Sequence, residues 1–290
     1  MEPIGGLLVF FILVGLVMHM IGGRERARLL TQFVISRSVV QSHPSAPFKI
    51  KGFVAKPSLY EFYNATFENV VADTDALRTE SYRLRHQVYC FEIKTEKPNR
   101  AGLECDEYDG NATHFLLRYR PSNIFIGTTR AILPPPGPEA QPLPYMKLCK
   151  TAQISMPSGF PHERAPEVSR FALSKDFRRR ALDTSYSIGS IQEDLKEDRA
   201  RIMPCMAIGL IAMICQFSKK NGYDRCCAVM KPALLQLLSK LGIHFVPVGP
   251  LVEYHGSRQI CYIIFDDLMA SVMKKSPDIA EIITDGGRYL

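Results

Sequence analysis

Three arginines and three carboxylates stand where the sequence predicts the ends of strands and helices, and not within runs of solvated charge. One arginine interrupts the otherwise apolar segment IFIGTTRAIL, and a glutamate and an arginine flank the start of EVSRFAL. A charge in a buried strand needs a partner of opposite sign, because an unpaired buried charge is costly. The sequence therefore predicts one polar cluster, made of Arg85, Asp106, Asp109, Arg130, Glu167 and Arg170.

Two interpretations of this cluster stay open from the residues alone. A carboxylate beside a substrate amine can act as a general base, and arginines can bind a substrate carboxylate. The same six charges can also satisfy one another as a purely structural network. Attack on a thioester by Cys90 or Cys105 is a further possibility, but the sequence places neither His86 nor His114 so as to activate them.

Hydrophobic periodicity predicts the elements that hold the cluster. Residues 75–91 carry apolar side chains at helical spacing, with Asp73 or Thr74 as a cap, and Arg85 lies beside that stripe. A polar, acidic loop follows over residues 94–110. The order of strand, helix and strand after residue 222 is of the βαβ type, so a mixed sheet flanked by helices is expected. The predicted strands are 67–72, 113–119, 124–133, 168–173, 225–230, 244–248 and 262–265, and the later helices are 201–219 and 232–241.

The overall composition and net charge indicate which classes of partner the protein could bind. The chain has 290 residues, of which 46% are hydrophobic and 22% charged, which suits one large globular domain or two small ones. A net charge of +7 suits an acidic partner such as nucleic acid, anionic lipid or an acidic carrier protein. Nucleic acid ranks last, because no zinc-finger or RNA-binding aromatic signature is present. Eight scattered cysteines without a CxxC pair favour reduced thiols and argue against a metal site.

The N-terminus predicts a membrane anchor. No charged residue occurs from Pro3 to Gly23, and about 20 apolar residues can span a bilayer as a helix. Arginines at 24, 26 and 28 then place the body of the protein in the cytoplasm. A misassigned start or an apolar helix docked on the domain are the alternatives. The expected organisation is an anchor over 1–23, a connector over 24–60, a catalytic domain over 61–275 and a C-terminal tail over 276–290.

Four segments in a fixed order carry a resemblance to known enzymes: YRLRHQVYCFE, ECDEYDGNATHFLLR, IGTTRAIL and PEVSRFALSKDFRRR. They resemble the acyl-homoserine lactone (autoinducer) synthases and the long-chain N-acyl amino acid synthases, and in particular acyltransferases associated with the PEP-CTERM/exosortase system. The resemblance extends over residues 60–270 and takes in LLQLLSKLGIHFVPVGPLVEYHGSRQICY. It implies an α/β (α+β) fold of the GNAT-like acyl-CoA N-acyltransferase type, whose mixed central sheet has a V-shaped splay.

The resemblance also implies an activity. It implies transfer of a long-chain acyl group from acyl-carrier protein or acyl-CoA to the amine of an amino acid or similar small molecule, without a permanently bound cofactor. Glu167 is then the expected general base, with Arg130 and Arg170 binding the acceptor or supporting that base. The expected substrate-binding residues are Arg85, Asp106 and Asp109, and the backbone N–H groups of Phe171, Ala172 and Leu173 as an oxyanion site.

Two departures from the resemblance shape these expectations. Autoinducer synthases usually carry tryptophan in this N-terminal active-site segment, and the chain has none, so Tyr89, Phe91 or Tyr108 would replace that surface. Lactone synthesis is therefore less favoured. An RxxGxG phosphate loop is also missing, and in its place stands a basic helix start that would dock an acidic carrier or is simply a solvated turn. The docking residues predicted there are Arg178, Arg179 and Arg180.

A second class of function remains open beside the enzyme. A GNAT-like module without catalytic activity would bind an acyl carrier or a metabolite as a sensor or scaffold. Formation of an acylated product distinguishes the two.

Overall fold

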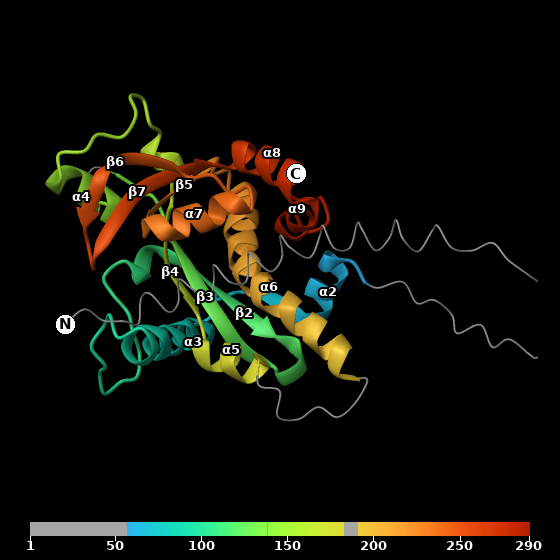
Figure 1. Cartoon of the computed structure of the whole chain (residues 1–290). Helices are drawn as coiled ribbons and strands as arrows, with labels where there is room; N and C mark the ends of the chain where they lie inside the picture. The colour runs from blue at the N-terminus through green and yellow to red at the C-terminus, as the bar shows by residue number, and fades with distance from the viewer. Residues whose placement is uncertain (1–56, 138, 183–190) are drawn as a thin grey trace, which may run out of the picture.

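The computed structural model describes residues 57–137, 139–182 and 191–290, without the side chains of 179–182 and 191–200. The predicted anchor and most of the predicted connector lie outside the described residues. Within them the chain forms a seven-stranded sheet in the order β1-β2-β3-β4-β5-β7-β6, with helices packed on it (Figure 1). The predicted mixed sheet flanked by helices is thus what the chain forms.

One pair of neighbouring strands runs parallel, and it lies in the middle of the sheet. The register pairs β4 with β5 at Glu167 with Cys227 and at Val168 with Ala228, although β4 continues to Leu173. The two strands therefore diverge, which gives the V-shaped splay that was expected. The strands are β1 (Phe67–Val71), β2 (Ala112–Tyr119), β3 (Ile124–Ile132), β4 (Glu167–Leu173), β5 (Arg225–Met230), β6 (Val246–Glu253) and β7 (Ser257–Ile264).

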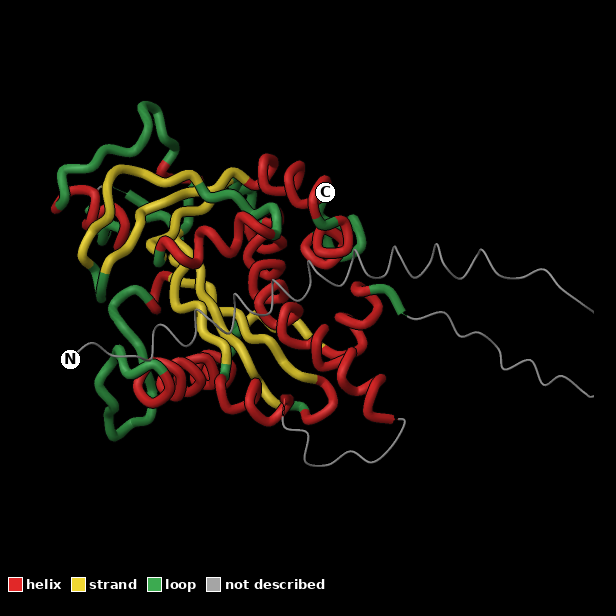
Figure 2. The backbone as a smooth tube through the Cα atoms, in the orientation of Figure 1, coloured by secondary structure: helices red, strands yellow, loops and turns green. Residues whose placement is uncertain are grey.

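The helices lie on both faces of the twisted sheet (Figure 2). Thr74 caps α3, because its side chain accepts a hydrogen bond from the N–H of Leu77 at 3.3 Å. A π-helical turn continues α3 through Gln87–Glu92. The helices are α2 (Leu59–Thr66), α3 (Asp75–His86), α4 (Pro144–Thr151), α5 (Lys175–Leu182), α6 (Ile191–Lys220), α7 (Pro232–Lys240), α8 (Phe265–Lys275) and α9 (Pro277–Ile283).

Alternating side chains of β4 separate the two faces. Val168 and Leu173 pack into the large core with α2, α6, α8 and α9, whereas Ala172 packs against Leu84 and Val88 at the α3 side. A smaller core joins α4 to β5, β6 and β7. The face that carries α3 and α4 is the one on which the charged residues gather.

Among the described residues, one helical stretch is long and apolar enough to cross a bilayer, Arg201–Lys220 in α6. Most of it is buried inside the protein, and Met206, Ile208 and Leu210 are fully enclosed in the core. It is therefore a core helix, as predicted.

Several segments differ from their expected structure. The strands expected over 244–248 and 262–265 are β6 and β7, which extend over Val246–Glu253 and Ser257–Ile264. Within residues 276–290, expected as a tail, Pro277–Ile283 form α9, whose Ile279, Ile282 and Ile283 are buried in the same core as α6. This helix is too short for its periodicity to stand out in the sequence. The strands β5 and β6 are parallel, as a βαβ unit requires, but β7 lies between them.

Candidate active site

Six charged side chains on the α3 face form a closed ring of alternating sign, called the charge ring below. Each arginine bridges two carboxylates, and each carboxylate bridges two arginines. Arg85 donates to Glu104 at 2.5 Å and to Asp109 at 2.6 Å. Arg170 donates to Glu104 at 3.1 Å and to Asp106 at 3.0 Å. Arg130 closes the ring through Asp106, at 2.6 and 2.8 Å, and through Asp109.

Different elements bring the ring together. Its arginines come from α3, β3 and β4, and its carboxylates come from the loop before β2. That loop is tied internally, because Asp109 accepts a hydrogen bond from the N–H of Asp106 at 2.8 Å and Asp106 accepts one from Tyr108 at 3.0 Å. The ring therefore fixes the acidic loop onto the sheet.

A bulge in β4 turns Arg170 toward the ring. The register passes from Thr128 with Ala172 to Arg130 with Ser169, so Thr129 faces two residues of β4. Arg170 adopts φ 52°, an uncommon backbone conformation for any residue other than glycine. Ser169 and Arg170 consequently both face Arg130, which donates to the Ser169 hydroxyl at 2.9 Å.

The charge ring has no net charge, and it is buried on one side and exposed to solvent on the other. The side chains of Arg85 and Arg130 are almost fully buried, whereas Arg170 is 22% and Asp106 18% exposed. Burial alone would raise the pKa of Asp106, but the hydrogen bonds and charge of Arg130, together with Arg170, lower that pKa to about 2. The ring's side that opens to solvent thus presents one cation next to one anion.

Glu167 lies outside the charge ring, which corrects the predicted membership. Five of the six predicted residues meet, and the third carboxylate is Glu104. The hydrogen bond that the structure describes for Glu167 comes from the N–H of Tyr145, at 2.8 Å, in the first turn of α4. Glu167 starts β4 two residues before Ser169, roughly 7 Å further along the strand, so it meets α4 instead of the ring.

Burial dominates the chemistry of Glu167. The residue is 2% exposed, and this burial raises the pKa of its carboxyl to about 8, against the smaller lowering by the Tyr145 N–H and by Arg130. The helix start at Tyr145 favours the charged form but does not outweigh the loss of water. Glu167 is therefore a group that changes its charge near neutral pH.

The raised pKa of Glu167 predicts a pH-dependent stability. Its unfolded value is about 4.3, so protonation of Glu167 stabilises the fold below that pH, and this contribution is lost as pH rises toward 8. Relative to Glu167→Gln, the wild-type protein should lose on the order of 1 kcal/mol of unfolding free energy per pH unit between pH 5 and 8. Urea unfolding of both proteins across this range measures it, and parallel curves would contradict the raised pKa.

Tyr89 holds the diverging edge of β4. Its hydroxyl donates to the carbonyl oxygen of Phe171 at 3.1 Å, and the Arg170 guanidinium lies 5.7 Å from its ring centroid. Of the candidates for the missing tryptophan surface, Tyr89 thus contacts the splay, whereas Phe91 is 58% exposed. The oxyanion role of the backbone at Phe171, Ala172 and Leu173 stays a prediction.

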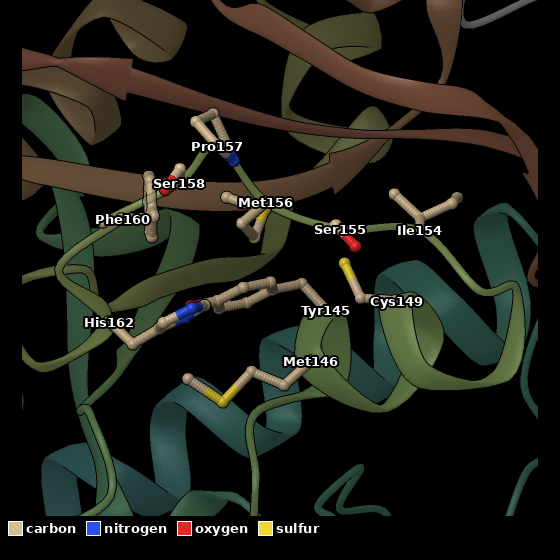
Figure 3. A pocket seen from close by; sticks show the side chains of 11 residues that line it. Tyr145, Met146, Cys149, Ile154, Ser155, Met156, Pro157, Ser158, Phe160 and His162 are labelled. Atoms are coloured by element: carbon tan, nitrogen blue, oxygen red, sulfur yellow. The ribbon is translucent and has the colours of Figure 1, made fainter.

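A pocket of about 460 Å³ lies between α4 and the segment before β4 (Figure 3). The Tyr145 ring forms one wall, and its hydroxyl hydrogen-bonds Nδ1 of His162 at 2.8 Å. Since the same residue's backbone binds Glu167, the pocket lies next to the buried carboxylate. It is lined by Tyr145, Met146, Cys149, Ile154, Ser155, Met156, Pro157, Ser158, Gly159, Phe160 and His162.

The predicted docking role of Arg178 is wrong for that residue. Arg178 is 7% exposed, with the neighbouring Phe177 packed in the core, so it cannot present its charge to a large carrier protein. The side chains of Arg179 and Arg180 lie outside the described residues.

Cys90 does not support the alternative of a thiol nucleophile. The Cys90 thiol donates to the carbonyl oxygen of Lys97 at 3.5 Å, and burial raises its pKa, which disfavours the reactive thiolate. His86 instead accepts a hydrogen bond from the N–H of Asn99 at 3.3 Å. In the part of the chain that the structure describes, no group of three His, Cys, Asp or Glu residues is arranged to hold a metal.

One family model and several solved structures match part of the chain. Residues 84–186 match the family model described as an acetyltransferase (GNAT) domain. TofI, solved in a ternary complex with an inhibitor and MTA, is 16% identical with a TM-score of 0.50, and the match covers 73% of this chain and 99% of that one. No curated protein matches the chain in sequence.

Two further solved structures resemble the chain. BjaI, a CoA-dependent acyl-homoserine lactone synthase solved with SAM and isopentyl-CoA, is 17% identical with a TM-score of 0.48, over 76% of this chain and 88% of that one. FeeM, an N-acyl amino acid synthase from uncultured soil microbes, is 16% identical with a TM-score of 0.46, over 72% and 96%. The domain match and the TofI likeness confirm the predicted GNAT-like fold.

Proposed function

We propose that the chain is an N-acyltransferase with Glu167 as its general base, because residues 84–186 match the GNAT acetyltransferase family model and the fold is GNAT-like. It moves a long-chain acyl group from a thioester donor, acyl-carrier protein or acyl-CoA, to the amine of an amino acid or similar small molecule. The observation that carries this proposal is a buried carboxylate with a pKa of about 8 at the root of the β4–β5 splay. A pKa near the working pH suits a group that must accept and return a proton.

The proposed reaction follows from this position. The acceptor ammonium loses a proton to Glu167 through a water molecule, because the carboxylate is enclosed, and the free amine attacks the thioester carbon. A C–N bond forms, the attacking nitrogen loses its second proton, and the C–S bond breaks. The leaving thiolate takes up one of the two protons, and the other passes to solvent. The backbone N–H groups along Phe171–Leu173 stabilise the oxyanion between these two events.

The charge ring supports an amino acid as acceptor. Its open side presents the guanidinium of Arg170 beside the carboxylate of Asp106, which matches the opposite charges of an amino acid zwitterion. The buried members, Arg85 and Arg130, hold these two groups in place.

The pocket beside Tyr145 is a second candidate binding place near Glu167. Its volume of about 460 Å³ lies in the usual range for small-molecule sites. Its exposed lining is mostly polar, which suits a polar part of a substrate better than an alkyl chain.

We further propose that residues 1–23 anchor the enzyme at the cytoplasmic face of the bacterial inner membrane, where a lipid-like amide would enter the bilayer, and that it acts alongside the PEP-CTERM/exosortase system. The apolar run and the arginines that follow it support the anchor. Carbonate washing of membranes should leave the full chain in the pellet and release a variant that lacks residues 1–23. Release of both would contradict the anchor.

The function is tested with purified protein, a long-chain acyl-carrier donor or acyl-CoA, and a mixture of amino acids, read by mass spectrometry. The expected result is an N-acyl amino acid whose formation needs the protein. A protein that binds the loaded carrier but yields no amide with any acceptor would be a binding module instead.

A further inference from the structure

The first turn of α5 already holds an anion that belongs to the protein. The side chain of Glu92 accepts a hydrogen bond from the backbone N–H of Lys175 at 2.7 Å. The first N–H groups of a helix have no partner within the helix, and together with the helix dipole they form a ready binding place for phosphate. In this chain a carboxylate from another element takes that place.

Neighbouring side chains hold Glu92 in this position. Glu92 ends the π-helical turn, an uncommon conformation that often marks a functional site. The side-chain amide of Gln87 donates to the other oxygen of Glu92 at 2.9 Å and reaches Ser174 at 3.3 Å. Ser174 in turn accepts from the N–H of Phe177 at 3.1 Å. The carboxylate is thus fixed by a small network, not by chance contact.

Arg178 supplies a second, independent sign of an anion site. The side chain is more than nine-tenths buried, and its Nε finds no hydrogen-bond partner among the described residues. Burial lowers the pKa of this guanidinium, and the charge that acts against that lowering is the Glu92 carboxylate. A buried arginine with an unsatisfied N–H beside a helix start is equipped for a further anionic group.

This helix start lies close to the proposed reaction. Three residues lie between Phe171 and Lys175, so the two are no more than about 14 Å apart. A thioester carbon near the β4 edge would therefore put the phosphate at the far end of its pantetheine arm in the region of the α5 start.

We propose that Glu92 is an internal competitor for the donor's phosphate. Its carboxylate occupies the α5 start, near the charge of Arg178, and so weakens the binding of donors whose phosphate needs that place. This inference rests on the proposed transfer from a thioester donor. Glu92 thereby makes donor binding depend on the phosphate groups that the donor carries. Binding of the acyl group and of the acceptor amine does not depend on Glu92.

The test compares binding of CoA and of pantetheine, which lacks phosphate, to the full chain by calorimetry. Glu92→Gln keeps an oxygen for the Lys175 N–H but removes the charge, so CoA should bind about tenfold more tightly. Pantetheine affinity should stay within about twofold. In the double variant with Arg178→Gln the gain in CoA affinity should disappear.

Glu96→Gln is the matched control, because it removes the same charge four residues further along the chain. Unchanged CoA affinity in Glu92→Gln, or an equal gain with pantetheine or with Glu96→Gln, would overturn the inference. Gln87→Leu removes the hydrogen bond that holds Glu92 but keeps the charge of Glu92. CoA affinity should rise in this variant too. CoA binding needs no acyl transfer, so an inactive protein would sink the proposed function and leave this test intact.

Discussion

Replacing Glu167 by glutamine is expected to slow acyl transfer by about 10²–10⁴-fold, the usual contribution of a positioned general base. Glutamine has the same size and still accepts the hydrogen bond from the Tyr145 N–H, so the fold and the substrate KM values should change little. The amide cannot take a proton from the acceptor amine. Steady-state rates of amide formation, with circular dichroism of the variant, measure the effect.

The matched control for this variant is Glu163→Gln, four residues earlier on an exposed turn. It should transfer acyl groups at the wild-type rate. If Glu167→Gln does so as well, Glu167 serves the start of α4 and is not the base.

Replacing Arg130 by glutamine should lower the free energy of unfolding by about 3–5 kcal/mol, because it leaves Asp106 and Asp109 with one arginine instead of two. Arg130 donates two hydrogen bonds to Asp106 and one to Asp109. Loss of activity should accompany the loss of stability, since the open side of the charge ring depends on Asp106. Urea unfolding followed by circular dichroism measures the difference.

Arg118→Gln on the neighbouring strand β2 is the control for the loss of one arginine. Arg118 lies 3.4 Å from Glu68, and both side chains are partly exposed, so the cost should be below about 1 kcal/mol. Equal losses in the two variants would mean that the charge ring adds nothing beyond an ordinary surface pair.

The sequence predicted the first five strands closely, because they are apolar runs with recognisable turns between them, but it found only part of β6 and β7. Arg130 and Arg170 stood out for the same reason, as charges inside such runs. Two of their partners in the loop, Asp106 and Asp109, were predicted, but the third, Glu104, was not. Glu104, Asp106 and Asp109 enter the ring while Glu107 stays at the surface, and this selection depends on the loop's own backbone hydrogen bonds.

Two local features of the site could not be predicted from the sequence, the bulge in β4 and helix α4. The bulge places Arg170 at a positive φ, and no residue pattern in EVSRFAL predicts this conformation. The prolines of residues 134–144 predict a surface loop, but helix α4 begins at Pro144, the last of them, so the sequence did not reveal the partner of Glu167. Because α4 was not predicted, Glu167 was grouped with the arginines. The position of α4 shows that Glu167 and the charge ring are two neighbouring but separate parts of the site.

The pH dependence of kcat/KM tests the role of Glu167 most directly. A base with a pKa of about 8 predicts a wild-type rate that rises with pH and levels off above an inflection near pH 8. The acceptor amine titrates in both enzymes, so the ratio of wild-type to Glu167→Gln rates isolates the carboxyl. We expect this ratio to climb about tenfold per pH unit below pH 8 and then to stay constant. A ratio that is flat from pH 6 to 10 would contradict general-base catalysis by Glu167.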